Sequence, residues 1–161
     1  MTALADSVLS DTRAFLSADY LPKISRCLDT LSETDVWWRP NAASNSIGNL
    51  VLHLDGSTRM WIVGVAGGRP VARDRAAEFA ERGPIAKGEL LAKLRATMAE
   101  VDQMLAQLDT GTLLERRTTS SREEVTVLWA ILHAVEHFAM HTGQIIVLTK
   151  ERTATDLGLR G

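Results

Sequence analysis

Disulfide-bonded, nucleic-acid-binding, secreted and membrane proteins are recognised by cysteine pairs, basic stripes, signal peptides and long apolar runs. This chain of 161 residues has few of these features. Its one cysteine, Cys27, cannot form an internal disulfide, so we expect the cytoplasm as its location. Its 18 basic and 20 acidic residues are interspersed, which leaves no basic stripe for a nucleic acid. The opening MTALADSVLSDTRAFL lacks a basic region followed by an apolar run, and no signal peptide is expected. Membrane spans are not expected either, since polar residues interrupt even the least charged stretch.

Glycine and proline are sparse, at 11 and 4 residues, and the sequence between them has helical spacing. We predict an all-α fold in a single domain, 1–161. Four helical segments are expected, at about 5–33, 45–68, 87–109 and 125–149. Pro22 should kink or restart the first segment, and the second should begin at an Asn45 or Ser46 cap and end at Gly67-Gly68. A short extended piece is expected within 110–124, and Cys27 on an apolar helical stripe should be buried.

The fourth segment, VTVLWAILHAVEHFAMHTGQIIVLT, carries one carboxylate, Glu136, and neither lysine nor arginine. A helix this uncharged is buried on more than one side. We therefore place it centrally in a four-helix bundle and predict that it also contributes to a homodimer interface. Its main apolar stripe is predicted to contain Leu128, Ile131, Leu132, Val135, Phe138, Ala139, Ile145 and Ile146.

Three of the four histidines, His133, His137 and His141, are four residues apart on the side of this helix away from that stripe. Histidines at i and i+4 can bind one metal ion, but eight residues rise about 12 Å, so all three cannot. The pair is His133 with His137 or His137 with His141, and His53 is the remaining imidazole. The spacing predicts a divalent metal site of three histidines and does not identify the metal.

Several polar and aromatic side chains are candidates for holding the ligands or lining a pocket, since ligating imidazoles usually donate their second N–H to a partner. These candidates are His133, Glu136, Asn49, Ser57, Gln144 and Trp61. The four tryptophans are expected mainly to pack, although Trp37 and Trp38 could line a pocket mouth. RDRAAEF, at 73–79, is interpreted as a charged, solvated connection, with contact of Arg73 or Arg75 with an anionic substrate as the alternative.

Three motifs, NSIGNLVLHLDG, RDRAAEF and HAVEHFAMHTGQI, resemble the DinB-like (YfiT-like) superfamily, and the resemblance extends back through WWRP to about residue 20. It implies a four-helix bundle of up-down-down-up connectivity, with a divalent metal held by one histidine of the second helix and two of the fourth. By position these are His53, His137 and His141, with His133 one turn away. Members include transferases and isomerases that use thiols such as bacillithiol or mycothiol.

The leading hypothesis is a metal-dependent S-transferase that uses a low-molecular-weight thiol, with zinc or nickel as the expected metal. Water as the nucleophile would make it a hydrolase instead. A third hypothesis is a helical dimer that binds metal or ligand without chemistry. A structural zinc site normally closes four positions with protein ligands, whereas a catalytic site leaves one open. The number of protein ligands therefore separates the catalytic hypotheses from the structural one.

Overall fold

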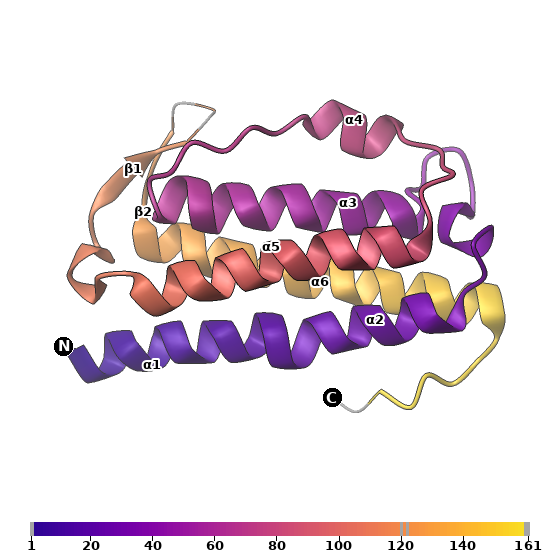
Figure 1. Cartoon of the computed structure of the whole chain (residues 1–161), viewed down its shortest axis with the longest axis horizontal. Coiled ribbons are helices and arrows are strands. Elements are labelled where there is room, and N and C mark those ends of the chain that lie inside the picture. The colour runs from indigo at the N-terminus through magenta and orange to yellow at the C-terminus, as the bar shows by residue number, and fades with distance from the viewer. Residues whose placement is uncertain (1, 120, 122, 160–161) are drawn as a thin grey trace.

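The computed structural model describes residues 2–119, 121 and 123–159. Over this part of the chain the protein is mostly helical, with one two-stranded sheet. Four long helical segments lie side by side, and a short helix lies over one of them (Figure 1). Among the described residues, no helix combines the length and the apolar character needed to cross a membrane.

The first helical segment joins α1 (Thr2–Arg13) to α2 (Leu21–Thr30) through a π-helical stretch, Ala14–Tyr20. In that stretch the hydrogen bonds span five residues, and the N–H of Leu21 donates to the carbonyl of Leu16. Pro22 falls in the first turn of α2, directly after the π-helical stretch. Tyr20 and Leu21 keep helical φ and ψ, so the predicted kink or restart is seen only as a change from π-helical to α-helical hydrogen bonding, without a break in the helix.

The second segment consists of α3 (Ile47–Thr58) and a π-helical stretch, Arg59–Ala66. Ser46 caps it, because its Oγ accepts from the backbone N–H of Asn49 at 3.1 Å while the Asn49 side chain accepts from the N–H of Ser46. Gly67 ends the helix, and Gly68 takes a φ of +66°, which favours glycine. The predicted start and stop are confirmed.

The third and fourth segments are α5 (Lys87–Gln107) and α6 (Val127–Thr153). A 3-10 turn, Thr110–Thr112, and a hairpin of β1 (Arg116–Thr118) and β2 (Glu124–Thr126) connect them. The strands are antiparallel, with Arg117 opposite Val125. The sequence predicted an extended piece here, and the structure has two paired strands. A further 3-10 turn, Asp35–Trp37, lies between α2 and α3.

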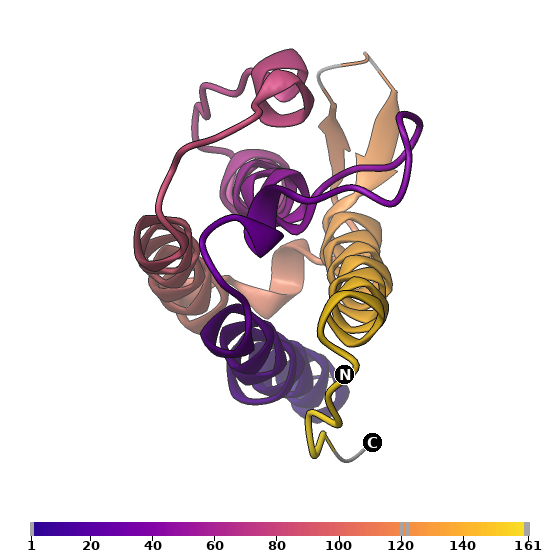
Figure 2. The ribbon, with the colours of Figure 1, turned by 90° about the vertical axis from the view of Figure 1, so that its right-hand side faces the viewer.

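The connection at 67–86 runs back along α3 and contains α4 (Arg75–Ala80), which packs on α3 (Figures 1 and 2). Asp74 caps α4 by accepting from the backbone N–H of Ala77 at 2.9 Å. The interpretation of 73–79 as a charged, solvated connection therefore holds for the exposed residues 74–77, but not for Arg73 and Glu78, whose side chains are only 12% and 10% exposed. The helix has only six residues, too few for an apolar stripe that would have revealed where it packs.

The core lies between the four long segments, with α3 packed on α5 and α6, and α2 packed on α6. Cys27 is fully buried, as predicted. The residues predicted for the apolar stripe of α6 differ in exposure. Phe138 is fully buried, whereas Leu132 is 52% exposed. The largest fully buried side chains include Leu16, Ile24, Leu28, Ile47, Leu54, Ile62, Leu90, Leu94, Met98, Leu105 and Phe138.

We expect Phe138→Ala to lower the free energy of unfolding by about 3–5 kcal/mol, because it leaves a cavity in the core. Leu132→Ala on the same helix is the control and should change it by about 0.5 kcal/mol or less. Denaturant unfolding of the two variants measures both values. Similar losses in the two variants would contradict this assignment of the buried face of α6.

Candidate metal centre

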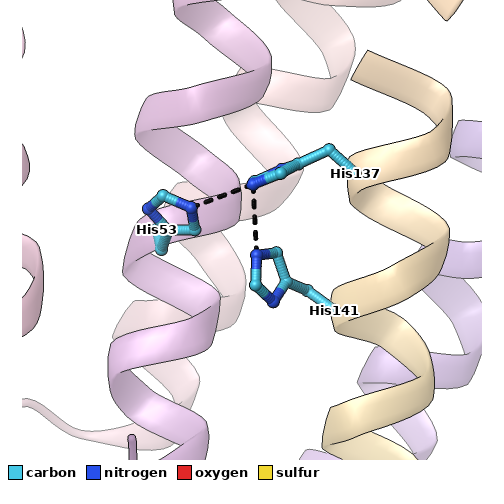
Figure 3. Close-up of side chains that lie close together, drawn as sticks. All are labelled: His53, His137 and His141. Atoms are coloured by element: carbon cyan, nitrogen blue, oxygen red, sulfur yellow. Dashed lines mark hydrogen bonds between the residues drawn. The ribbon is translucent and has the colours of Figure 1, made fainter. Parts of the chain in front are cut away.

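His53 of α3 meets His137 and His141 of α6 between the two helices (Figure 3). The Nε2 atom of His137 lies 3.1 Å from Nε2 of His53 and 3.1 Å from Nε2 of His141. One ligand atom from each of the three residues lies within 4.8 Å of the other two. Of the two pairs left open by the spacing, the structure brings His137 and His141, not His133 and His137, together with His53.

The hydrogen bonds around the cluster orient two of these rings. Nδ1 of His53 lies 2.9 Å from Oε2 of Glu78, and Nδ1 of His141 lies 2.6 Å from Oε1 of Gln144. A carboxylate or an amide oxygen only accepts, so each Nδ1 carries the hydrogen and each neutral ring presents an Nε2 lone pair to the centre. Both lone pairs face Nε2 of His137, which can donate at most one hydrogen. Two acceptors therefore share one donor, and a cation between the rings would satisfy all three nitrogen atoms.

Burial keeps two of the three imidazoles, those of His137 and His141, uncharged at neutral pH. Burial, reinforced by the neighbouring His141 and His53, lowers the pKa of His137 to about 3. Burial also lowers the pKa of His141, although its hydrogen bond to Gln144 opposes the shift. Uncharged rings can offer their lone pairs to a metal at neutral pH. The three residues thus fit a divalent ion in ligand type and spacing.

The group contains three ligands among the residues that the structure describes, and no cysteine or carboxylate of that part of the chain joins it. A structural zinc ion normally takes four protein ligands. Three histidines would instead leave a coordination position for solvent or substrate, as in a catalytic site. The donor set is therefore compatible with a site that keeps one position open.

A largely buried ion pair that was not predicted from the sequence lies beside His53. Arg73 donates to Glu78 through two nitrogen atoms, at 2.7 Å from Nε to Oε1 and 2.8 Å from Nη2 to Oε2. The Glu78 and Arg73 side chains are 10% and 12% exposed. Burial would raise the pKa of Glu78, but the hydrogen bonds from Arg73 and His53 outweigh it, so the pKa lies below its usual value. The carboxylate is ionised.

The two arginines considered as contacts for an anionic substrate differ in exposure, since Arg73 is partly buried and Arg75 is exposed. Arg73 is engaged by Glu78, and Arg75 lies over the ring of Phe79, 5.0 Å from its centroid. The sequence pattern at 73–79 does not indicate that Glu78 contacts His53, which lies twenty-five positions upstream. Only the tertiary structure reveals this contact.

The polar residues predicted near the ligands differ in burial and in their hydrogen-bond partners. Gln144 bonds His141, as expected of a supporting residue. Asn49 is fully buried, yet it holds backbone instead of a histidine, with Nδ2 donating to the carbonyls of Glu78 and Glu81. Ser57 is also buried, on the same helix as His53. Glu136 points to solvent, as its exposed position on α6 shows.

His133 belongs to an aromatic cluster beside the three histidines. Its ring stacks on Trp129, with centroids 4.9 Å apart, and meets Trp61 edge-on at 4.7 Å. Its centroid is 5.8 Å from that of His137. The predicted pocket residues His133 and Trp61 thus lie together, one turn of α6 from the ligand atoms.

Trp37 and Trp38 do line a surface pocket, together with Arg82 and Arg152. Trp37 also has a packing role, since its Nε1 donates to the carbonyl of Ile85 at 3.1 Å. An added Cβ at Gly48 would overlap the Trp37 ring, which shows how closely the ring lies on α3. Both roles considered for this pair from the sequence are present, away from the histidines.

A family model described as mycothiol-S-transferase matches residues 12–153. A DinB-like protein (YjoA) from Bacillus subtilis has a similar structure, with a TM-score of 0.70, 20% sequence identity and 96% of each chain covered. A conserved protein from Enterococcus faecalis gives a TM-score of 0.68 at 16% identity, over 93% of this chain and 95% of that one. No functionally curated protein matches significantly. This chain therefore belongs to the mycothiol-S-transferase family, within the DinB-like superfamily that its histidine motifs resemble.

Proposed function

We propose that the protein is a metal-dependent S-transferase that joins the sulfur of a low-molecular-weight thiol to an electrophilic substrate. The observation that carries the proposal is the convergence of three imidazoles from two helices, with no fourth protein ligand among the described residues. The family match supports a small thiol as one of the two substrates.

In this proposal His53, His137 and His141 hold a divalent ion, with zinc or nickel preferred because imidazole suits both. A bound ion would lower the pKa of a thiol at the open position and so supply the thiolate. Gln144 holds the ring of His141 with its Nε2 toward the centre. His133, Trp61 and Trp129 offer an aromatic surface for the organic part of a substrate, and Trp129 is 46% exposed.

The metal site predicts a specific pattern of loss in histidine variants. His53→Ala, His137→Ala and His141→Ala should each abolish tight metal binding, because each removes one of only three ligands. His133→Ala is the matched control, with a neighbouring imidazole on the same helix, and should retain metal. Elemental analysis for zinc, nickel, iron and copper in the purified, untagged proteins measures metal per chain. Equal losses in all four variants would show that the ligand set is wrong.

The proposed transferase reaction should consume the low-molecular-weight thiol. With mycothiol and an electrophile such as an alkyl or aryl halide, the metal-loaded protein should form the thioether, and His137→Ala should fall to the uncatalysed rate. Mass spectrometry of the product and the loss of free thiol are the two measurements, with bacillithiol as the comparison thiol. Release of the leaving group without loss of thiol would identify water as the nucleophile and contradict the transferase.

We also propose a homodimer formed through α6. Its outward face carries apolar side chains that water would otherwise surround, namely Trp129, Leu132, Met140 and Val147, which are 46%, 52%, 52% and 63% exposed. Light scattering should give twice the chain mass of 17.6 kDa, and Leu132→Glu should shift it toward one chain. A wild-type mass of one chain at micromolar concentration would overturn the dimer.

We also propose the predicted helix connectivity, the single domain and the cytoplasmic location. The long return of residues 67–86 along α3 supports up-down-down-up connectivity, because it brings α5 to the end at which α3 began (Figure 1). A shared core of all four long segments supports a single domain. The single cysteine, which is buried, is consistent with a cytoplasmic protein.

A further inference from the structure

We propose that Glu78, fixed by Arg73, is a positioning residue that sets the tautomer and orientation of His53 for metal binding. The inference rests on the proposed metal centre. It assigns a role to α4, the helix that the sequence analysis interpreted as a solvated connection. It also identifies a requirement for glycine at position 56.

The hydrogen bonds of the Glu78 carboxylate define this arrangement. Oε1 accepts from Nε of Arg73, and Oε2 accepts both from Nη2 of Arg73 and from Nδ1 of His53. With two bonds to the guanidinium, the carboxylate has little freedom to rotate. Nη2 of Arg73 also lies 3.1 Å from Nδ1 of His53, but the carboxylate is closer, at 2.9 Å, and Nη2 already donates to it at 2.8 Å. The bond to Glu78 then places the hydrogen of His53 on Nδ1 and directs Nε2 toward His137.

Glycine at position 56 makes room for this carboxylate. Gly56 lies on α3, three residues after His53, and an ideal Cβ there would overlap Oε1 of Glu78. Cβ would also lie 3.1 Å from Nε of Arg73. Glycine costs helix stability relative to alanine, by about 1 kcal/mol in a helix interior. The close approach of Glu78 gives a physical reason for its presence here.

The ion pair is poorly explained as a device for stability alone. Among the residues of α4, none is buried, so little apolar packing compensates for removing two charges from water. Other contacts already hold α4 on α3, since Asn49 bonds two carbonyls at its C-terminal end. What the ion pair adds is a charged partner for one particular imidazole nitrogen.

The support of His53 differs from that of the other two imidazoles. His141 has a neutral partner, the amide of Gln144, which is exposed. His53 has an ionised partner, and a carboxylate raises the basicity of the ring it holds. Because Arg73 offsets the charge of Glu78, the pair adds this support without adding net negative charge beside the site. His53 is therefore the ligand whose affinity for metal should depend most on its partner.

The test uses the full-length apo protein and Co²⁺, whose visible spectrum reports the ligand geometry, in competition with a chelator of known affinity. Glu78→Ala should weaken Co²⁺ binding by about 10–100-fold, the usual effect of losing such a partner. Glu78→Gln keeps an oxygen acceptor and should lose less. Glu136→Gln, on an exposed carboxylate of α6, is the matched control and should bind as the wild type does.

Gly56→Ala separates positioning from folding. Its methyl group should displace the Glu78 carboxylate and weaken Co²⁺ binding by tenfold or more, while the apo protein in chelator still unfolds cooperatively, because alanine favours the helix where glycine does not. A spectral change at Co²⁺ saturation in Glu78→Ala and Gly56→Ala, absent in the control, would further support a displaced His53.

The outcomes distinguish the two proposals. If the wild type binds Co²⁺ tightly and both Glu78→Ala and Gly56→Ala bind it equally well, the metal centre stands and the positioning role is overturned. Weaker binding that merely parallels a lower melting temperature in chelator would also overturn it in favour of a structural role. If the wild type binds neither Co²⁺, zinc nor nickel, the metal centre itself is overturned, and the positioning role with it.

Discussion

The structure of the site depends on three imidazoles whose Nε2 atoms converge between α3 and α6, where burial lowers the pKa of His137 and of His141. Such an arrangement is costly, because two lone pairs face a single possible hydrogen at 3.1 Å. It persists only if the surrounding side chains fix each ring. Gln144 does so for His141, and Glu78 does so for His53. The rest of the bundle can be understood as the support for these contacts.

Each element contributes a different part of that support. The four-residue step places His137 and His141 on one face of α6, while fully buried Phe138 anchors the same turn in the core. The cap formed by Ser46 and Asn49 fixes the start of α3, and Asn49 extends it by holding the end of α4. The same buried amide therefore joins the helix that carries His53 to the helix that carries its carboxylate partner.

Some interpretations from the sequence were wrong for a common physical reason. At 73–79 the chain is short, charged and mostly exposed, so hydrophobic periodicity carried no information about what it contacts. The helical wheel placed Leu132 on the apolar stripe, yet Leu132 is 52% exposed. A wheel shows which residues share a face of the helix, but it does not show where the neighbouring helices lie. Glu136 is next to His137 in the sequence, but its side chain is exposed. Glu78 is twenty-five positions from His53 in the sequence, yet it is the carboxylate that contacts a histidine.

The sequence alone determined the features that depend on local spacing. These include the long helical segments and their caps, the burial of Cys27, and the restriction of the metal site to two histidines of α6 with His53. Tertiary structure decided which pair of α6 meets His53, and it showed that the predicted support from Gln144 is made while that from Glu136 is not. It also brought Arg73 and Glu78 behind His53. The physical reason is that caps and helix faces are set within a few residues, whereas contacts across twenty-five or eighty-four positions exist only once α3, α4 and α6 have packed.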